Sequence, residues 1–254
     1  MIRFLLLMLT FSMSLNALSL KEPSGELKEP FIELLTLFEI PQDLPERKLL
    51  PLLLEHWIQK SPLSISFQRR LNEKEQEAFP LLQELGCIDT ISPKEPFYRY
   101  ALIMGGNRGE VQKRLDFLYD EWKKGLRFVQ VILLTDERVL PLIEKHPLKE
   151  IAPHIFVSSN PQKRKSIAAR RITDWLDTNP TPGNCLVISS QPHIGYEEAV
   201  ARLFLPETFS VEGVGAPAPF DPFDRSISQT PYPLLVYLDN IARWYIYESM
   251  TETQ

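Results

Sequence analysis

The feature that most constrains the fold is a strand-length apolar run that ends in two glycines and is followed at once by a helical pattern. The run covers residues 100–104, and Gly105 and Gly106 interrupt it. Apolar residues then recur at helical spacing, at Val111, Leu115, Leu118 and Trp122. This order predicts a strand, a tight turn and a helix. In an open α/β sheet such a unit places backbone N–H groups and a helix N-terminus at the carboxyl edge of the strand, where we expect a ligand to bind.

Further apolar segments of strand length follow, separated by helical patterns. They cover residues 128–134, 155–158, 185–188 and 209–214. Strands that alternate with helices in this way predict an α/β fold with a doubly wound, mostly parallel sheet. Residues 215–233 are rich in proline and aspartate, which indicates an ordered surface loop or lid, and an amphipathic helix over 234–245 is expected after it.

The chain before this domain has a different pattern. Residues 31–58 have helical spacing but are divided by prolines, Pro51 among them, which predicts two or three short helices. Residues 73–85 predict another helix, with Gly86 at its C-terminal cap. We therefore expect an N-terminal segment at 1–19, a linker and helical subdomain at 20–95, and the α/β domain at 96–254.

The N-terminal segment has the pattern of an export signal. Arg3 precedes an apolar run over residues 4–9 that continues with interruptions to residue 15. Ala17 and Ser19 are small residues at the −3 and −1 positions of a signal-peptidase site. We expect cleavage and a periplasmic or secreted protein. An uncleaved membrane anchor and a cytosolic protein with an apolar N-terminal helix remain the alternatives.

Charge and cysteine content narrow the classes of function. The net charge of −5 and the pI near 5.5 argue against a nucleic-acid binder, which would carry a basic face. A basic cluster within residues 163–171 indicates either a solvated helix face, which we favour, or an anion site. Cys87 and Cys185 indicate either one disulfide or, as we favour, two separate buried thiols. No cysteine or histidine cluster has zinc spacing, so no metal is expected.

Polar residues follow the predicted second and fourth strands, where the crevice of such a sheet lies. Asp136 and Glu137 are the best carboxylates for acid/base chemistry or for binding ribose hydroxyls, although adjacent residues point in different directions. His193 follows a strand end near two serines and is the favoured histidine. A serine-hydrolase triad has little support because the GxSxG elbow is absent.

Several segments together resemble the SanA/YdcF-like family of bacterial α/β proteins. They are YALIMGGNRGEVQKRLDFLYDEWKKG at 100–125, RFVQVILLTDERVL at 127–140, NCLVISSQPHIGYEEAV at 184–200, FSVEGVG at 209–215 and YLDNIARWYIYE at 237–248. The resemblance implies a Rossmann-like fold with a pocket at the strand ends. Besides Asp136, Glu137 and His193, it places the pocket at Gly105, Gly106, Asn107, Arg114, Thr135, Arg138, Ser189, Ser190 and Gln191.

The resemblance also implies a role. Members of the family are linked to the bacterial cell envelope, and one branch has been associated with S-adenosylmethionine. We therefore expect an exported protein that binds a small polar or nucleotide-like ligand and acts in envelope maintenance. Whether it associates with the membrane or the cell wall is left open. Residues 160–169 are basic where related sequences carry an acidic residue, so a non-catalytic envelope factor is the alternative. A second alternative is a cytosolic S-adenosylmethionine-binding protein.

Overall fold

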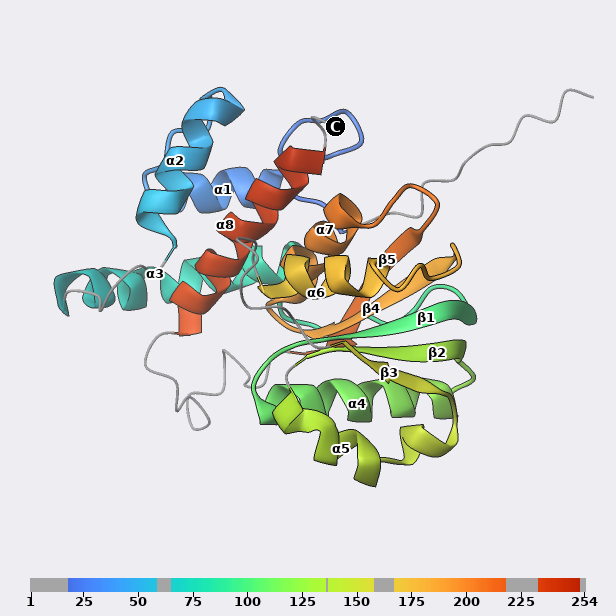
Figure 1. The fold of residues 1–254 in the computed structure, drawn as a ribbon. Helices are drawn as coiled ribbons and strands as arrows, with labels where there is room; N and C mark the ends of the chain where they lie inside the picture. Colours follow the sequence, from blue (N-terminus) through green and yellow to red (C-terminus); the bar gives the residue numbers. More distant parts are fainter. Residues whose placement is uncertain (1–17, 59–64, 136, 158–166, 218–232, 252–254) are drawn as a thin grey trace, which may run out of the picture.

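A parallel sheet lies at the centre of the computed structural model, which describes residues 18–58, 65–135, 137–157, 167–217 and 233–251 (Figure 1). Its strands are β1 (Phe97–Met104), β2 (Arg127–Leu134), β3 (His154–Phe156), β4 (Asn184–Ser190) and β5 (Ser210–Ala216). They lie in the order β3-β2-β1-β4-β5 and every pair is parallel. The chain winds outward from β1 to β3 and returns to β4 on the other side of β1. The predicted doubly wound α/β fold is thus confirmed, and its topological switch point lies between β1 and β4.

Helices cover both faces of the sheet. In chain order they are α4 (Arg108–Lys123), the 3₁₀ turn η1 (Glu137–Val139), α5 (Leu140–Lys145), the 3₁₀ turn η2 (Pro147–Glu150), α6 (Ile167–Leu176) and α7 (Ile194–Phe204). Figure 1 shows α4 and α5 on one face and α6 and α7 on the other. Strands buried on both faces read as continuous apolar runs, which is why they are evident in the sequence.

The remaining helices form a third layer outside α7. They are α1 (Glu29–Leu37), α2 (Glu46–His56), α3 (Ile65–Glu84) and the final helix α8 (Pro233–Thr251). We call α1, α2 and α3 the helical lobe. Its core includes Phe31 and Leu53, and it continues into Tyr237 and Leu238 of α8. The lobe therefore packs around the last helix of the chain.

Several predicted boundaries are wrong. The helix expected at 73–85 begins at Ile65, and α2 runs through Pro51 instead of ending there. Pro51 removes one backbone hydrogen bond, but Leu49 and Leu53 on either side of it are buried in the lobe core. β4 extends to Ser190, so the two serines lie within the strand rather than after it. Helix α5 was not predicted, and residues 158–166 and 218–232, which include the expected lid, lie outside the described residues.

The two cysteines lie apart in different layers. Both are free and buried, Cys87 in the lobe core and Cys185 in the core between the sheet and α6–α7. Burial raises the pKa of each thiol to about 12. The prediction of two separate buried thiols is confirmed. Among the described helices, none combines the length and apolarity that crossing a bilayer demands.

Candidate functional site

A cavity of about 550 Å³ opens at the carboxyl edge of the sheet. We call it the sheet-edge cavity. Residues from five parts of the chain line it: the turn after β1, η1, α6, α7 and α8. They are Gly105, Gly106, Arg138, Ile167, Ala168, Arg171, Tyr196, Glu197 and Arg243. Gly105, Gly106 and Arg138 were predicted from the sequence, and the structure places all three at this cavity.

The wall of the cavity carries more positive than negative charge. Among the described residues, Arg138, Arg171 and Arg243 line it together with one carboxylate, that of Glu197. Arg243 is held by Asp239 one turn earlier, with Nε and Oδ2 2.7 Å apart, and this hydrogen bond raises the pKa of Arg243. Guanidinium groups present paired N–H donors that match the oxygens of phosphate and carboxylate groups. The lining therefore favours an anionic ligand.

Gly105 makes room for one of these arginines. Nη1 of Arg171 donates to the carbonyl oxygen of Leu134 at the end of β2, at 3.1 Å. A Cβ atom at position 105 would overlap that nitrogen. A glycine at position 105 therefore leaves room for the end of a side chain from α6, which a larger residue would displace.

Beneath the cavity lies a buried polar network centred on Arg114 of α4. Arg114 is 1% exposed, donates to the carbonyl oxygen of Gly105, and lies 3.6 Å from a carboxylate oxygen of Glu197. Ser189 of β4 donates its hydroxyl hydrogen to that carboxylate, and Ser190 lies 3.5 Å from Arg114. Removing one partner from a buried pair costs about 3–5 kcal/mol because the other charge is left uncompensated. The network thus fixes the turn after β1 against β4.

The first turn of α4 is closed by a capping box. The side chain of Asn107 accepts from the backbone N–H of Glu110 at 3.0 Å, and Glu110 accepts from the backbone N–H of Asn107 at 2.7 Å. Asn107 therefore caps the helix. His193 is also near this turn, with Nε2 4.0 Å from Glu110 and Nδ1 2.7 Å from Oδ1 of Asn240. It does not line the sheet-edge cavity.

The other predicted residues are distributed around this centre. Thr135 is 1% exposed and its hydroxyl has no hydrogen-bond partner among the described residues. Glu137 is exposed in η1, and Asp136 lies outside the described residues. Gln191 is buried and donates to the carbonyl oxygens of Gly86 and Asp89, so it ties β4 to the segment after α3 instead of facing the cavity.

Six lining residues were not among the sequence candidates for the site, and four of them, Tyr196, Glu197, Arg171 and Arg243, carry polar groups. Glu197 and Tyr196 lie in the first turn of α7, directly after the polar end of β4. Their position just after a polar strand end is the sequence feature that could have identified them as site residues. Arg171 belongs to the basic cluster interpreted as a solvated face, but it is half-buried at the cavity. Arg243 lies on α8 and reaches the site only through tertiary packing.

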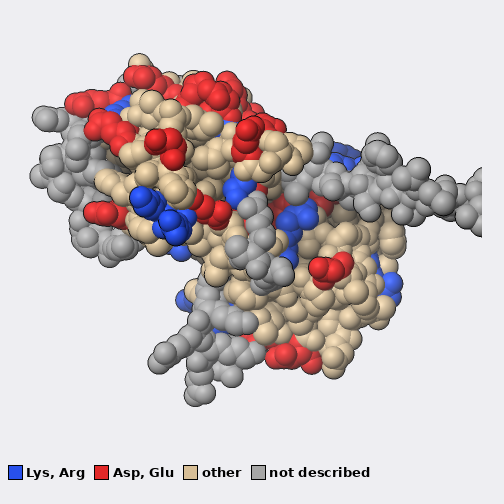
Figure 2. Space-filling view, turned by 90° about the horizontal axis from the view of Figure 1, so that it is seen from above, with Lys and Arg blue, Asp and Glu red and all other residues tan. Residues whose placement is uncertain are grey.

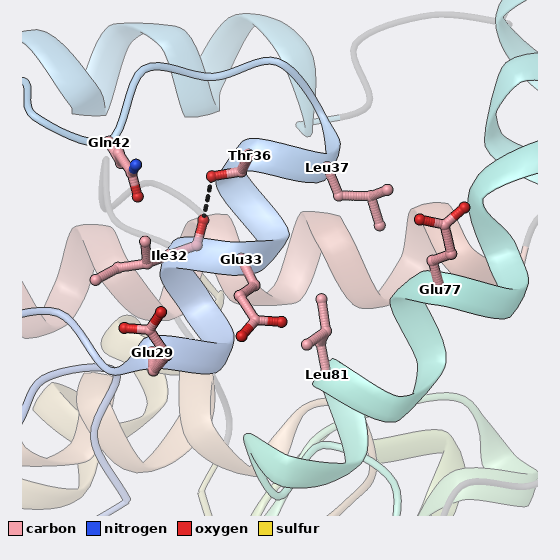
Figure 3. Close-up of a pocket in the computed structure, with 8 residues that line it drawn as sticks. All are labelled: Glu29, Ile32, Glu33, Thr36, Leu37, Gln42, Glu77 and Leu81. Carbon is pink, nitrogen blue, oxygen red and sulfur yellow. Dashed lines mark hydrogen bonds between the residues drawn. The ribbon is translucent and has the colours of Figure 1, made fainter.

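A second cavity, of about 420 Å³, lies between α1 and α3 in the helical lobe (Figure 3). Its polar lining includes three carboxylates, those of Glu29, Glu33 and Glu77. Figure 3 shows Glu29 and Glu33 on α1 and Glu77 on α3, and no cluster suited to holding a metal ion occurs among the described residues. Figure 2 shows acidic side chains gathered over the lobe. The two cavities therefore differ in charge, and the sheet-edge cavity is the candidate site for an anion.

Comparisons with protein-family models, with curated proteins and with solved structures give no match to this chain.

Proposed function

We propose that the protein binds a small polar ligand with an anionic, nucleotide-like group in the sheet-edge cavity. We further propose that it is an exported, SanA/YdcF-like protein that acts in envelope maintenance. The observation that carries the ligand proposal is the convergence of Arg138, Arg171 and Arg243 on the turn after β1, next to the topological switch point. Open α/β sheets bind their ligands at this position.

The charge of the lining supports phosphate over other ligand chemistry. A phosphate group accepts paired hydrogen bonds from arginines, and three arginines line this cavity. S-adenosylmethionine carries a sulfonium and an ammonium cation beside one carboxylate, so three arginines favour it less than a phosphate-bearing nucleotide. The export and envelope parts of the proposal rest on the N-terminal pattern and the family resemblance.

A non-catalytic binding role is the second candidate, and the positions of two predicted catalytic residues favour it over turnover. Glu137 is exposed and His193 is engaged with Asn240, and neither lines the cavity. The serine nearest to a cavity carboxylate, Ser189, is fully buried and donates to Glu197. Substitution of His193 by alanine is therefore expected to leave ligand affinity unchanged.

Thermal unfolding of the purified protein tests the ligand proposal. Nucleoside phosphates and sugar phosphates are compared with the matching nucleosides and sugars, with S-adenosylmethionine and with cell-wall fragments. A ligand present at 100 times its Kd stabilises the native state by about 2.7 kcal/mol, which raises the Tm. We expect a phosphate-dependent rise that Arg171→Gln abolishes and Lys113→Gln, on the exposed face of α4, leaves intact. A rise that survives Arg171→Gln would place the ligand elsewhere, and no rise with any phosphate compound would refute the proposed ligand class.

A further inference from the structure

The segment from Ser19 to Lys28 is bound to the end of the last helix. The side chain of Leu20 is fully buried in the lobe core, and its carbonyl oxygen accepts from the N–H of Lys28 at 2.9 Å. The backbone N–H of Leu20 donates to Oε2 of Glu248 on α8, at 3.0 Å. The hydroxyl of Ser19 donates to the other carboxylate oxygen. Both oxygens of Glu248 therefore receive a donor at the Ser19–Leu20 junction.

We propose that the mature chain begins at Leu20 and that its α-ammonium group is bound by the carboxylate of Glu248. The inference rests on the export part of the proposed function and is independent of the ligand. Among the described residues, Leu20 is the first that is fully buried in the lobe core, while Leu18 is partly buried against it, so a cut after Leu20 would remove a core side chain. Ala17 and Ser19 supply the small residues that a signal-type endopeptidase requires on the other side of the bond.

The reaction is hydrolysis of one peptide bond by such an endopeptidase. Water adds to the carbonyl carbon of Ser19 and the C–N bond to Leu20 breaks. Residues 1–19 leave with a new carboxylate on Ser19, and the nitrogen of Leu20 takes up protons to become an ammonium group. That nitrogen already lies 3.0 Å from Glu248, and the N–H donors of an ammonium group replace the two donors that Ser19 and the amide present to this carboxylate, while the N–H of Lys21 loses the Ser19 hydroxyl as its acceptor.

The local charges favour a cation at this point. Glu248 stands in the last turn of α8, which carries no basic residue, and the carboxyl end of a helix is the negative end of its dipole. The charged group nearest in the chain is Lys21, which is 8% exposed, lies 3.8 Å from Glu46 of α2 and covers the ring of Tyr245 at 5.7 Å. An ammonium group at Leu20 places a cation in hydrogen-bond contact with the carboxylate of Glu248.

Intact-mass analysis tests the position of the cut. The full chain, with its own N-terminus, is produced in a bacterium and isolated from the cell envelope and periplasm. We expect the mass of residues 20–254. A chain that begins at Leu18, or at any residue after Leu20, would overturn the inference while leaving export in place. An uncut chain found in the cytosol would overturn both.

The pH dependence of amine acetylation tests the pairing with Glu248. An α-amino group has an ordinary pKa of about 7.7–8.0, and a carboxylate within hydrogen-bond reach raises it by about one unit or more. Near pH 7, below both pKa values, we therefore expect the amine of the native mature protein to react about tenfold more slowly than in the urea-unfolded chain. Glu248→Gln should remove this difference. Glu26→Gln, which neutralises an exposed carboxylate in the same segment, should not.

The wild-type comparison of native and unfolded protein decides the question even if Glu248→Gln fails to fold. Equal amine pKa values in the two states would overturn the pairing. If the pairing holds, its stabilising effect is present at pH 7, where the amine is charged in both states. It is lost as the pH rises through the folded-state pKa.

Discussion

Arg114 is the residue on which the geometry of the site depends most. Its guanidinium group holds the carbonyl oxygen of Gly105, faces Glu197 and approaches Ser190, so it joins the turn after β1 to α7 and β4. A group that is 1% exposed has little water around it, and its hydrogen bonds are correspondingly costly to lose. The backbone at the cavity is thus fixed before any ligand arrives, which reduces the entropy cost of binding.

Substitution of Gly105 by alanine should displace Arg171 from the cavity. The new methyl group would overlap Nη1 of Arg171, which must then leave the carbonyl oxygen of Leu134. We expect at least a tenfold loss of affinity for a phosphate ligand, since one charge-assisted hydrogen bond contributes about 1.5–3 kcal/mol. Calorimetric titration measures this loss. Gly109→Ala, where the nearest atom to the new Cβ is 3.4 Å away, is the control and should bind normally.

At the scale of elements, α4 is the helix whose start is best defined by its own sequence. Asn107 and Glu110 satisfy each other's backbone N–H groups, and Val111, Leu115 and Leu118 bury one stripe against the sheet. The helix therefore begins at a fixed residue immediately after the glycine pair. Its N-terminal dipole end is held at the carboxyl edge of β1.

Asn107→Ala should destabilise the protein by about 1 kcal/mol, because the N–H of Glu110 loses its acceptor. Urea unfolding measures the change as a lower midpoint with an unchanged slope. Lys113→Ala, on the exposed side of the same helix, should leave the midpoint in place. An equal midpoint for wild type and Asn107→Ala would mean that the capping box contributes nothing to stability.

The elements were more predictable from sequence than the site was. Buried parallel strands are continuous apolar runs, and the helix cap at Asn107 uses residues three apart, so local spacing reveals both. Glu197 and Arg171 meet the turn after β1 only because β4 returns beside β1 and α6 precedes it. The boundary errors at Pro51 and Ser190 have the same origin, because burial in a core and pairing with β5 outweigh local preferences there.

At the scale of the whole molecule, α8 joins the helical lobe to the α/β domain. On the lobe side the rings of Phe79 and Tyr237 lie 5.6 Å apart in a T-shaped arrangement. On the sheet side the rings of Tyr196 and Tyr247 lie 5.5 Å apart, and a Cβ at Gly195 would fall 2.5 Å from the ring of Trp244. One helix thus supplies core residues to the lobe and a cavity-lining residue, Arg243, to the site.

Leu238→Ala should destabilise the lobe and the α/β domain together. Leu238 is fully buried, and removing a buried leucine side chain costs about 2–5 kcal/mol. We expect a single, lower calorimetric transition, because neither part keeps its packing without α8. Val236→Ala, on the exposed side of the helix, is the control. Two separate transitions in the Leu238→Ala protein would show that the lobe and the α/β domain unfold independently.

The place of α8 at the end of the chain has a consequence for synthesis. The lobe is translated before the sheet, but its core is completed by residues of α8, which are made after all five strands of the described sheet. While the chain is being made, Phe31 and Leu53 can pack on lobe neighbours such as Trp57, but the α8 side of their core is still missing. A chain of this design completes its first-made core only after the whole sheet has been synthesised.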